Sequence, residues 1–329
     1  GEYRRQRQMC IRDSMYKIED IKAIHLEVTS RCQAKCPMCA RRINGGPLNP
    51  FMGLDEITID KFMEWFPIDF IKQLNHLAIC GNLGDPIVAK DTLPIYEYLR
   101  EANPTMTLQM HTNGSGRTKE WWQKIAKLGV QTVFAIDGLA DTHAKYRINT
   151  DWKKIIDNVM TFVDAGGKAR WDMLVFQHNE HQVEECRTLS QRLGMESFTI
   201  KHTTRFKDGK FDVLNEQGQT IDTLYPTELS KKMMGKVKKA SAEQLPTIKC
   251  KAVKDSMLYV SALGSVTPCC WLDQQFYPHT HENRIDYMNK IKVWPNLNNT
   301  TMKDIFASGY FDLIACLLYT SDAADDIRR

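Results

Sequence analysis

The 329-residue sequence lacks the features that mark membrane, secreted or nucleic-acid-binding proteins. No apolar run approaches the length that crosses a bilayer, and the basic residues near the N-terminus are not followed by the apolar segment of a signal peptide. Lys and Arg total 44 against 40 Asp and Glu, a bias too small to favour nucleic acid or a membrane surface. No run of arginines and aromatics suits base stacking. We therefore predict a cytoplasmic protein that binds neither nucleic acid nor a membrane.

Cysteine is also sparse, because ten unevenly spread residues are too few for a disulfide scaffold in a chain of this length. Three of them, Cys32, Cys36 and Cys39, nevertheless fall within one short loop, which in a reducing compartment indicates a metal site. Zinc is one alternative, but it usually requires a second nearby pair of ligands, and scattered buried cysteines are the simplest alternative. Cys80 and Cys186 fall inside a strand and a helix candidate, where apolar packing explains them.

The two ends of the sequence differ from the rest. Residues 1–14 and 316–329 carry no periodic apolar pattern, and they resemble the translated sequencing-adapter read-through found at the ends of metagenomic gene fragments. We expect these segments to be non-native, the natural protein to start near Met15, and this copy to be cut soon after Ala315. Cys316 is therefore not expected to be a ligand.

Six short apolar runs alternate with helical segments between residues 23 and 201, the pattern of repeated βα units around a parallel sheet. The predicted strands are 23–28, 76–80, 106–112, 130–137, 172–178 and 197–201. The predicted helices are 58–72, 91–102, 118–128, 151–165 and 180–193. Six such units favour an α/β partial (β/α)6 TIM-like barrel over an open doubly wound sheet, although periodicity alone leaves both open.

The βα pattern ends in a polar, turn-rich stretch over 203–218, so we divide the chain there. Residues 15–215 form the predicted barrel, and 216–247 form a linker with a lysine-rich amphipathic helix. Residues 248–315 are predicted to form a β-hairpin, with its turn at Gly264, followed by an amphipathic helix.

The loop with Cys32, Cys36 and Cys39 follows the first predicted strand. It would lie at the carboxyl end of the sheet, where parallel α/β folds bind ligands. A cuboidal [4Fe–4S] cluster needs four ligands, so three cysteines leave one iron open to another molecule. Another molecule can bind and react at that open iron.

The spacing CxxxCxxC after a first β-strand resembles the signature of the radical S-adenosylmethionine (radical SAM) enzymes, and the resemblance extends over residues 24–201. It implies that Cys32, Cys36 and Cys39 bind a [4Fe–4S] cluster whose fourth iron is chelated by S-adenosylmethionine (SAM). It also implies that an electron from the cluster cleaves SAM to a 5′-deoxyadenosyl radical, which abstracts a hydrogen from the substrate. An electron donor such as flavodoxin or ferredoxin is the expected partner.

Motifs at later strand ends strengthen the resemblance. GNLGDP (81–86) resembles the family's GGEP, HTNGS its TNG, and FAIDG followed by DTHAKYR the SxDG…HDxxR pattern of peptide-modifying members. Asp85 replaces the usual glutamate, and Ala135 replaces a ribose-contacting serine. An ordinary turn is the alternative for Gly-Asp-Pro. Met38 stands where an aromatic residue often lies against adenine, and a thioether makes a similar contact. The resemblance implies that the cofactor-binding residues are Met38, Gly84, Asp85, Pro86, Thr112, Asn113, Asp137, Arg147 and Asn179.

The C-terminal hairpin carries a second cysteine pattern. Cys250, Gly264 and Cys269 resemble the CX9–15GX4C opening of the SPASM or twitch domain, which implies an auxiliary [4Fe–4S] cluster. A hairpin with structural thiols is the alternative. Cys270 neighbours Cys269, and adjacent side chains on a strand point to opposite faces, so we do not expect both at one cluster. The domain's other cysteines would follow Ala315, so we expect a truncated auxiliary site.

Members with such an extension most often modify a ribosomally made peptide, so the resemblance implies a peptide substrate and oxidoreductase-like chemistry. A cyclase or dehydrogenase that acts on a small molecule is the alternative enzyme. From a different class, a non-catalytic zinc or iron–sulfur protein would also use the three cysteines. The sequence leaves the reaction, the substrate and the oligomeric state open.

Overall fold

The computed structural model describes residues 17–50, 52–240, 250–276, 295–312 and 314. The strands are β1 (Ala23–Leu26), β2 (His76–Ile79), β3 (Thr107–Thr112), β4 (Gln131–Ala135), β5 (Ala169–Leu174), β6 (Ser197–Lys201), β7 (Phe211–Leu214), β8 (Thr220–Leu224), β9 (Met257–Val260) and β10 (Val266–Thr267). The α-helices are α2 (Ile59–Trp65), α3 (Ile68–Lys72), α4 (Thr92–Ala102), α5 (Lys119–Lys127), α6 (His143–Tyr146), α7 (Trp152–Asp164), α8 (Val183–Arg192), α9 (Glu228–Ala240), α10 (Lys251–Lys254), α11 (Cys270–Phe276) and α13 (Met302–Ala307). Two 3-10 turns are η1 (Ile18–Asp20) and η2 (Glu180–Gln182).

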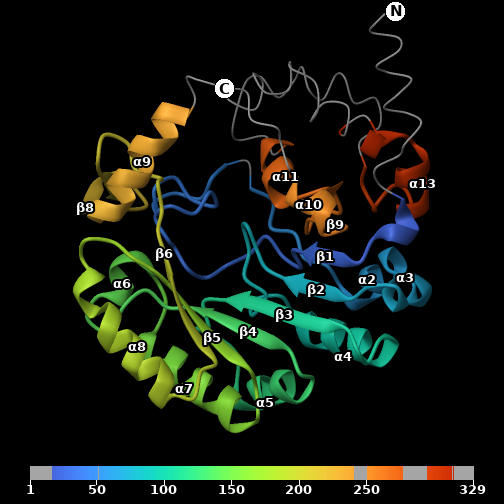
Figure 1. The fold of residues 1–329 in the computed structure, drawn as a ribbon, viewed down its shortest axis with the longest axis horizontal. Coiled ribbons are helices and arrows are strands. Elements are labelled where there is room, and N and C mark those ends of the chain that lie inside the picture. The colour runs from blue at the N-terminus through green and yellow to red at the C-terminus, as the bar shows by residue number, and fades with distance from the viewer. Residues whose placement is uncertain (1–16, 51, 241–249, 277–294, 313, 315–329) are drawn as a thin grey trace, which may run out of the picture.

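Eight strands form one sheet in the order β10-β9-β1-β2-β3-β4-β5-β6. From β1 to β6 every neighbouring pair is parallel, and each connection contains at least one helix, as parallel pairing requires. The sheet curves, and α4, α5, α7 and α8 lie along its outer side (Figure 1). The predicted α/β fold with six βα units in a partial barrel is therefore confirmed.

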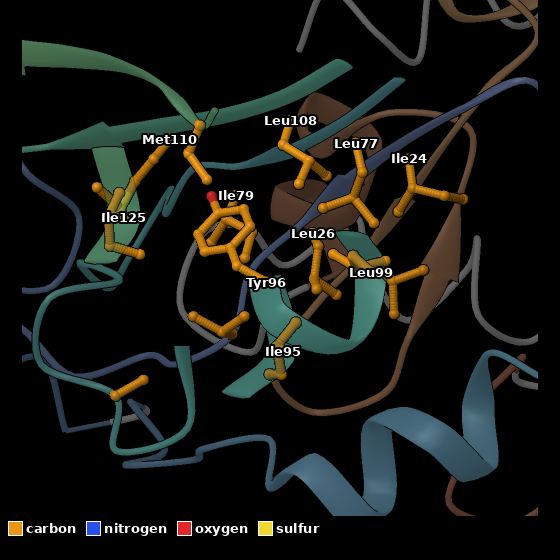
Figure 2. Close-up of a cluster of buried hydrophobic side chains, with 14 of the residues drawn as sticks. Ile24, Leu26, Leu77, Ile79, Ile95, Tyr96, Leu99, Leu108, Met110 and Ile125 are labelled. Atoms are coloured by element: carbon orange, nitrogen blue, oxygen red, sulfur yellow. The ribbon is translucent and has the colours of Figure 1, made fainter. Parts of the chain in front are cut away.

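Alternation along the strands builds the core between the sheet and the outer helices. The labelled side chains in Figure 2 are Ile24, Leu26, Leu77, Ile79, Leu108 and Met110 from β1 to β3 and Ile95, Tyr96, Leu99 and Ile125 from α4 and α5. All of them are fully buried. The intervening positions, such as His25 and His111, are half-buried and lie on the opposite face of the sheet.

The predicted C-terminal hairpin is confirmed as β9 and β10, which pair antiparallel. It is not a separate sheet, because β9 runs parallel to β1, with Leu258 opposite Ile24 and Val260 opposite Leu26. Leu258, Tyr259 and Val260 of β9 are buried against the barrel for this reason. The hairpin thus extends the barrel sheet at its β1 edge.

One expectation for this region is wrong. β10 ends at Thr267, and Cys270 is the first residue of α11 instead of a strand residue. Pro268 gives the physical reason, because proline has no N–H for the sheet ladder and its ring fixes φ. Cys269 and Cys270 therefore lie at the entry to a helix, where the rule of opposite strand faces does not apply.

A second hairpin, β7 and β8, occupies sequence that the hydrophobic pattern marks only as a polar break. Val213 and Leu224 from this hairpin are buried in a small apolar cluster with Cys36 and Met38. The carbonyl of Asn44 accepts a hydrogen bond of 2.9 Å from a β7 backbone N–H. The hairpin therefore covers the cysteine loop and holds it in place.

Candidate active site

A cavity of about 670 Å³ opens at the carboxyl ends of β1 to β4. Its walls include Cys32, Cys36, Cys39, Met38, Cys80, Gly84, Asp85, His111, Thr112, Asn113, Ala135, Tyr146, Arg147, Arg205 and Trp271. Most of the predicted site residues are on this wall, although they come from loops after four different strands. Pro86, Asp137 and Asn179 are not among the residues that line it.

The three loop cysteines all face this cavity. Cys36 is buried, and Cys32 and Cys39 are partly buried. Burial raises the pKa of Cys36 to about 11, and it also raises the pKa values of Cys32 and Cys39. Among the described residues, no three His, Cys, Asp or Glu side chains come close enough together to hold one metal ion. Three thiols on one cavity wall are the donor set that an iron–sulfur cluster with one open iron requires.

Arg147 connects one of these cysteines to a buried carboxylate. Its Nε donates to Asp137 Oδ2 at 2.5 Å, and its Nη1 lies 3.7 Å from the Sγ of Cys36. Burial alone lowers the pKa of Arg147, but Asp137 and Cys36 raise it overall, so the guanidinium stays charged. A fixed cation beside a thiol favours the thiolate, which is the form that binds iron.

Asp85 is buried and accepts four hydrogen bonds from the protein. Its Oδ1 accepts from Thr112 Oγ1 at 2.7 Å and from the Ile87 N–H at 3.1 Å. Its Oδ2 accepts from the backbone N–H of Asn113 at 2.7 Å and from Asn113 Nδ2 at 2.6 Å. A carboxylate has about four acceptor positions, so all of them are used here. Asp85 thereby fixes Asn113, whose Nδ2 also lies 3.7 Å from Cys32 Sγ.

Glu27 is a site residue that the motifs do not reveal. It is fully buried, and its Oε1 accepts from the backbone N–H groups of Leu83 and Gly84 at 2.6 and 2.9 Å. Its Oε2 accepts from the hydroxyl of Tyr259 on β9 at 2.6 Å. Glu27 therefore joins the segment between β1 and the cysteine loop to the 81–86 loop and the C-terminal hairpin. A lone glutamate in the apolar run AIHLEV is the signal that could have identified it.

Gly84 has a steric role in the same place. A Cβ atom at this position would lie 1.7 Å from the carbonyl oxygen of Thr29, which is backbone and cannot move aside cheaply. Glycine is required because the 81–86 loop and the chain leading to Cys32 touch here. The predicted contact of Gly84 with a cofactor is a separate matter and stays a prediction.

Asn179 is fully buried and committed to backbone groups. Its Nδ2 donates to the carbonyl groups of Asp137 and Leu174, both at 3.1 Å, and its Oδ1 accepts from the Phe176 N–H at 2.8 Å. Asn179 thus fixes the ends of β4 and β5 behind the cavity wall. Its cofactor contact stays a prediction, as do those of Pro86, Asp137 and the residues on the wall.

Several residues on the cavity wall are absent from the predicted set, among them Cys80, His111, Arg205 and Trp271. Cys80, taken as core packing from its place in a strand, is half-buried and faces the cavity. Burial lowers the pKa of His111 to about 4, so its imidazole is neutral at pH 7. Arg205 and Trp271 follow β6 and β10, and Trp271 is 67% exposed. No family motif covers these positions, so only the fold places them at the site.

Cys250 and Cys269 approach one another in the C-terminal region. Cys250 precedes α10 and Cys269 precedes α11, and both are partly buried. Burial raises the pKa of Cys269, and the nearby thiol of Cys250 adds to this effect. The turn at Gly264 therefore brings the two thiols into electrostatic range. Whether they bind a cluster stays a prediction.

Comparison with known families identifies the class of protein. Residues 26–189 match the family model described as the radical SAM superfamily. The chain belongs to this superfamily, and it is an enzyme of the radical SAM type. The superfamily implies a [4Fe–4S] cluster and SAM, and the three thiols on one cavity fit that donor requirement.

Solved structures share the fold at low sequence identity. SuiB from Streptococcus suis, bound to S-adenosylmethionine, is 12% identical with a TM-score of 0.60, covering 92% of this chain and 71% of that one. SuiB bound to its precursor peptide SuiA is 12% identical with a TM-score of 0.57, covering 94% and 66%. The anSMEcpe structure with bound AdoMet is 14% identical with a TM-score of 0.57, covering 94% and 80%. These identities show the fold alone, and this chain spans about two thirds of the SuiB chain.

None of the helices in the described part of the chain has the length and apolar character that crossing a membrane needs.

Proposed function

We propose that this protein binds a [4Fe–4S] cluster through Cys32, Cys36 and Cys39, binds SAM beside it, and modifies a peptide by radical chemistry. The observation that carries the proposal is the convergence of the three thiols with the Asp85–Asn113 network and Arg147 around one cavity. When bound, the cluster and SAM together supply a 5′-deoxyadenosyl radical that removes a hydrogen atom from the substrate.

The chain's own residues would bind and orient the cluster and shield it from water. Arg147 holds positive charge beside Cys36 and offsets the negative charge that three thiolates bring. Asn113 is held rigid by Asp85, with its amide aimed at the Cys32 sulfur. The β7–β8 hairpin buries Cys36 and Met38, which keeps water from this side of the loop.

Two structural neighbours support a peptide substrate. SuiB has been solved with the precursor peptide SuiA, and anSMEcpe with AdoMet and the Cp18Cys peptide. The cavity here is open toward the exposed Trp271, so a side chain on an extended peptide could enter it.

We also propose that Cys250 and Cys269 contribute to an auxiliary [4Fe–4S] cluster, and that the enzyme works in the cytoplasm with a flavodoxin or ferredoxin as electron donor. The proximity of the two thiols supports the first part. Iron analysis tests it: about eight irons per reconstituted chain are expected if both clusters form, against about four for one. Cys269→Ala should lower a count of about eight to about four, and a count of about four in the unchanged protein would show that this chain does not complete an auxiliary cluster.

The main test is formation of 5′-deoxyadenosine. The full chain, reconstituted anaerobically with iron and sulfide, is mixed with SAM and dithionite, and the nucleoside is quantified. We expect product from the unchanged protein and none above background from Cys36→Ala. Cys186→Ala is the matched control, because Cys186 is buried in α8 and does not line the cavity. An intact cluster that gives no 5′-deoxyadenosine would overturn the proposal.

A further inference from the structure

We propose that a second cavity beside the cluster cavity binds an acidic segment of the substrate peptide, with Arg205 contacting a carboxylate. This inference rests on the proposed function, because it names the class of substrate for the same site.

The two cavities form one continuous surface. The second has a volume of about 590 Å³ and is lined by Asn44, Arg205, Phe206, Lys207, Asp208, Lys210, Phe211 and Asp212. Three of these residues, Asn44, Arg205 and Phe211, also line the cluster cavity. A chain that enters the cluster cavity can therefore continue over Phe211 into the second cavity without leaving the protein surface.

The charges at this junction are unevenly matched. Lys210 pairs with Asp212 at 3.0 Å, Arg42 on the cluster side pairs with Glu216 at 2.9 Å, and Arg147 pairs with Asp137 at 2.5 Å. Within the residues that the structure describes, neither Arg205 nor Lys207 forms an ion pair. Asp208 is the remaining acid on the wall, so the unpaired charge there is net positive.

Arg205 lies where the two cavities meet, and it has N–H donors beyond the one that it uses within the protein. Its Nη1 donates to the carbonyl of Met38 at 3.1 Å, which anchors the guanidinium to the cysteine loop. A guanidinium carries five N–H donors, and the others are free to form a bidentate contact with a carboxylate. The hydrogen bond to Met38 holds the guanidinium charge of Arg205 beside the cysteine loop, and Arg205 remains exposed.

The backbone beside Arg205 forms a tight turn between Lys207 and Lys210. Lys207 and Lys210 form a pair of backbone hydrogen bonds of 3.1 Å around Asp208 and Gly209, which both have positive φ angles, 52° and 76°. Such a tight two-residue turn is rigid, because its twist matches that of the flanking chain. Less conformational entropy is then lost when a ligand binds than on a mobile loop.

A peptide fits this surface better than a small anion alone. Phe206 and Phe211 present aromatic surface between the charged groups. The two joined cavities are together much larger than a single carboxylate or phosphate. An extended peptide segment with an acidic residue can pack against the two phenylalanine rings and pair its carboxylate with Arg205.

Binding of labelled peptides tests the inference directly. The probe is a fluorescein-labelled decapeptide in which Glu alternates with Gly, and the comparison peptide carries Gln in place of each Glu. Fluorescence anisotropy with the reconstituted full chain should show binding of the Glu peptide about tenfold tighter than the Gln peptide. Equal affinities would overturn the inference.

Variants assign the effect to the proposed residue. Arg205→Gln should weaken binding of the Glu peptide about tenfold, and Arg205→Lys should restore part of it. Lys119→Gln, on a separate cavity with Gln123 and Lys127, is the matched control and should leave affinity unchanged. An equal loss in Lys119→Gln would mean that general surface charge is responsible, which contradicts the inference. Circular dichroism of each variant checks the fold.

Two further outcomes separate the alternatives. If 10 mM inorganic phosphate displaces the Glu peptide completely, whereas 10 mM chloride does not, the site binds a small anion and the peptide inference is wrong. If the Glu peptide binds as expected while the unchanged protein makes no 5′-deoxyadenosine from SAM, the proposed function fails and this inference about the surface does not. If the protein cleaves SAM but shows no preference for the acidic peptide, the proposed function stands and this inference about the surface fails.

Discussion

The guanidinium of Arg147 lies between a carboxylate and a thiol, with its Nε 2.5 Å from Asp137 and its Nη1 3.7 Å from Cys36. Asp137 has no exposed surface, so its charge depends on this partner. We predict that Arg147→Gln lowers the free energy of unfolding by about 3–5 kcal/mol, because it leaves a buried carboxylate unpaired. Urea denaturation measures this loss.

The same variant should also lower iron content after reconstitution, because Cys36 loses the cation that favours its thiolate. Lys153→Gln is the control, since Lys153 forms an exposed pair with Asp157 that water screens, so its loss should change stability little. Iron content that stays normal in Arg147→Gln would show that the contact with Cys36 has no role in metal binding.

Glu27 gives a prediction that separates hydrogen bonding from charge. Glu27→Leu removes the acceptor of Leu83, Gly84 and Tyr259, and leaving these buried donors unpaired should cost about 3–5 kcal/mol. Glu27→Gln should retain most of the stability, because the amide oxygen still accepts from both N–H groups and the tyrosine hydroxyl can rotate to accept from the amide. Urea denaturation compares the two variants. Equal losses would show that the charge of Glu27, and not its acceptors, holds the loop.

Gly84→Ala is expected to disturb the cluster site through the backbone. The added Cβ would clash with Thr29, so the 81–86 loop must separate from the segment that leads to Cys32. We expect iron content to fall by at least about half and the melting temperature to drop. Gly235→Ala in α9 is the matched control, because a Cβ there meets nothing within 4 Å and alanine favours a helix by about 1 kcal/mol. A fully loaded Gly84→Ala protein would show that the contact is not needed.

The extent to which the sequence predicts the structure depends on how local each signal is. The six βα units follow from periodicity, and the cysteine loop falls after β1 because the run 23–28 is apolar. The partners of Glu27 and Arg205 are separated from them by more than 50 and 160 residues, so no local pattern reveals them. The strands of the β7–β8 hairpin bury only Val213 and Leu224, and β9 pairs with β1 although the two strands are more than 200 residues apart. These features depend on long-range packing, which local patterns in a single sequence do not reveal.

His143 contributes a pH dependence to stability that can be worked out from its contacts. Its side chain is 1% exposed, its Nδ1 accepts from the Asp137 N–H at 3.1 Å, and its Nε2 contacts Thr150 Oγ1 at 3.0 Å. Burial, together with the nearby Arg147 charge, lowers the pKa of His143 to about 3. In the unfolded chain its pKa is about 6.5, so between these values the unfolded state binds more protons. The stabilisation is therefore complete above pH 6.5 and is lost as the pH falls toward 3.

We predict that this group alone lowers the free energy of unfolding by about 2 kcal/mol between pH 6.5 and pH 5, at about 1.4 kcal/mol per pH unit once the unfolded imidazole is protonated. Other buried histidines, such as His111, add to the slope of the unchanged protein, so the informative quantity is the difference between it and His143→Gln. The variant should be less stable at pH 7, because it loses fitted hydrogen bonds, yet its stability should fall less steeply on acidification. Urea denaturation from pH 7 to pH 4.5 measures both, with substitution of the exposed His181 by Gln as the control for loss of a histidine. Parallel curves for His143→Gln and the unchanged protein would mean that His143 is not held neutral by the fold.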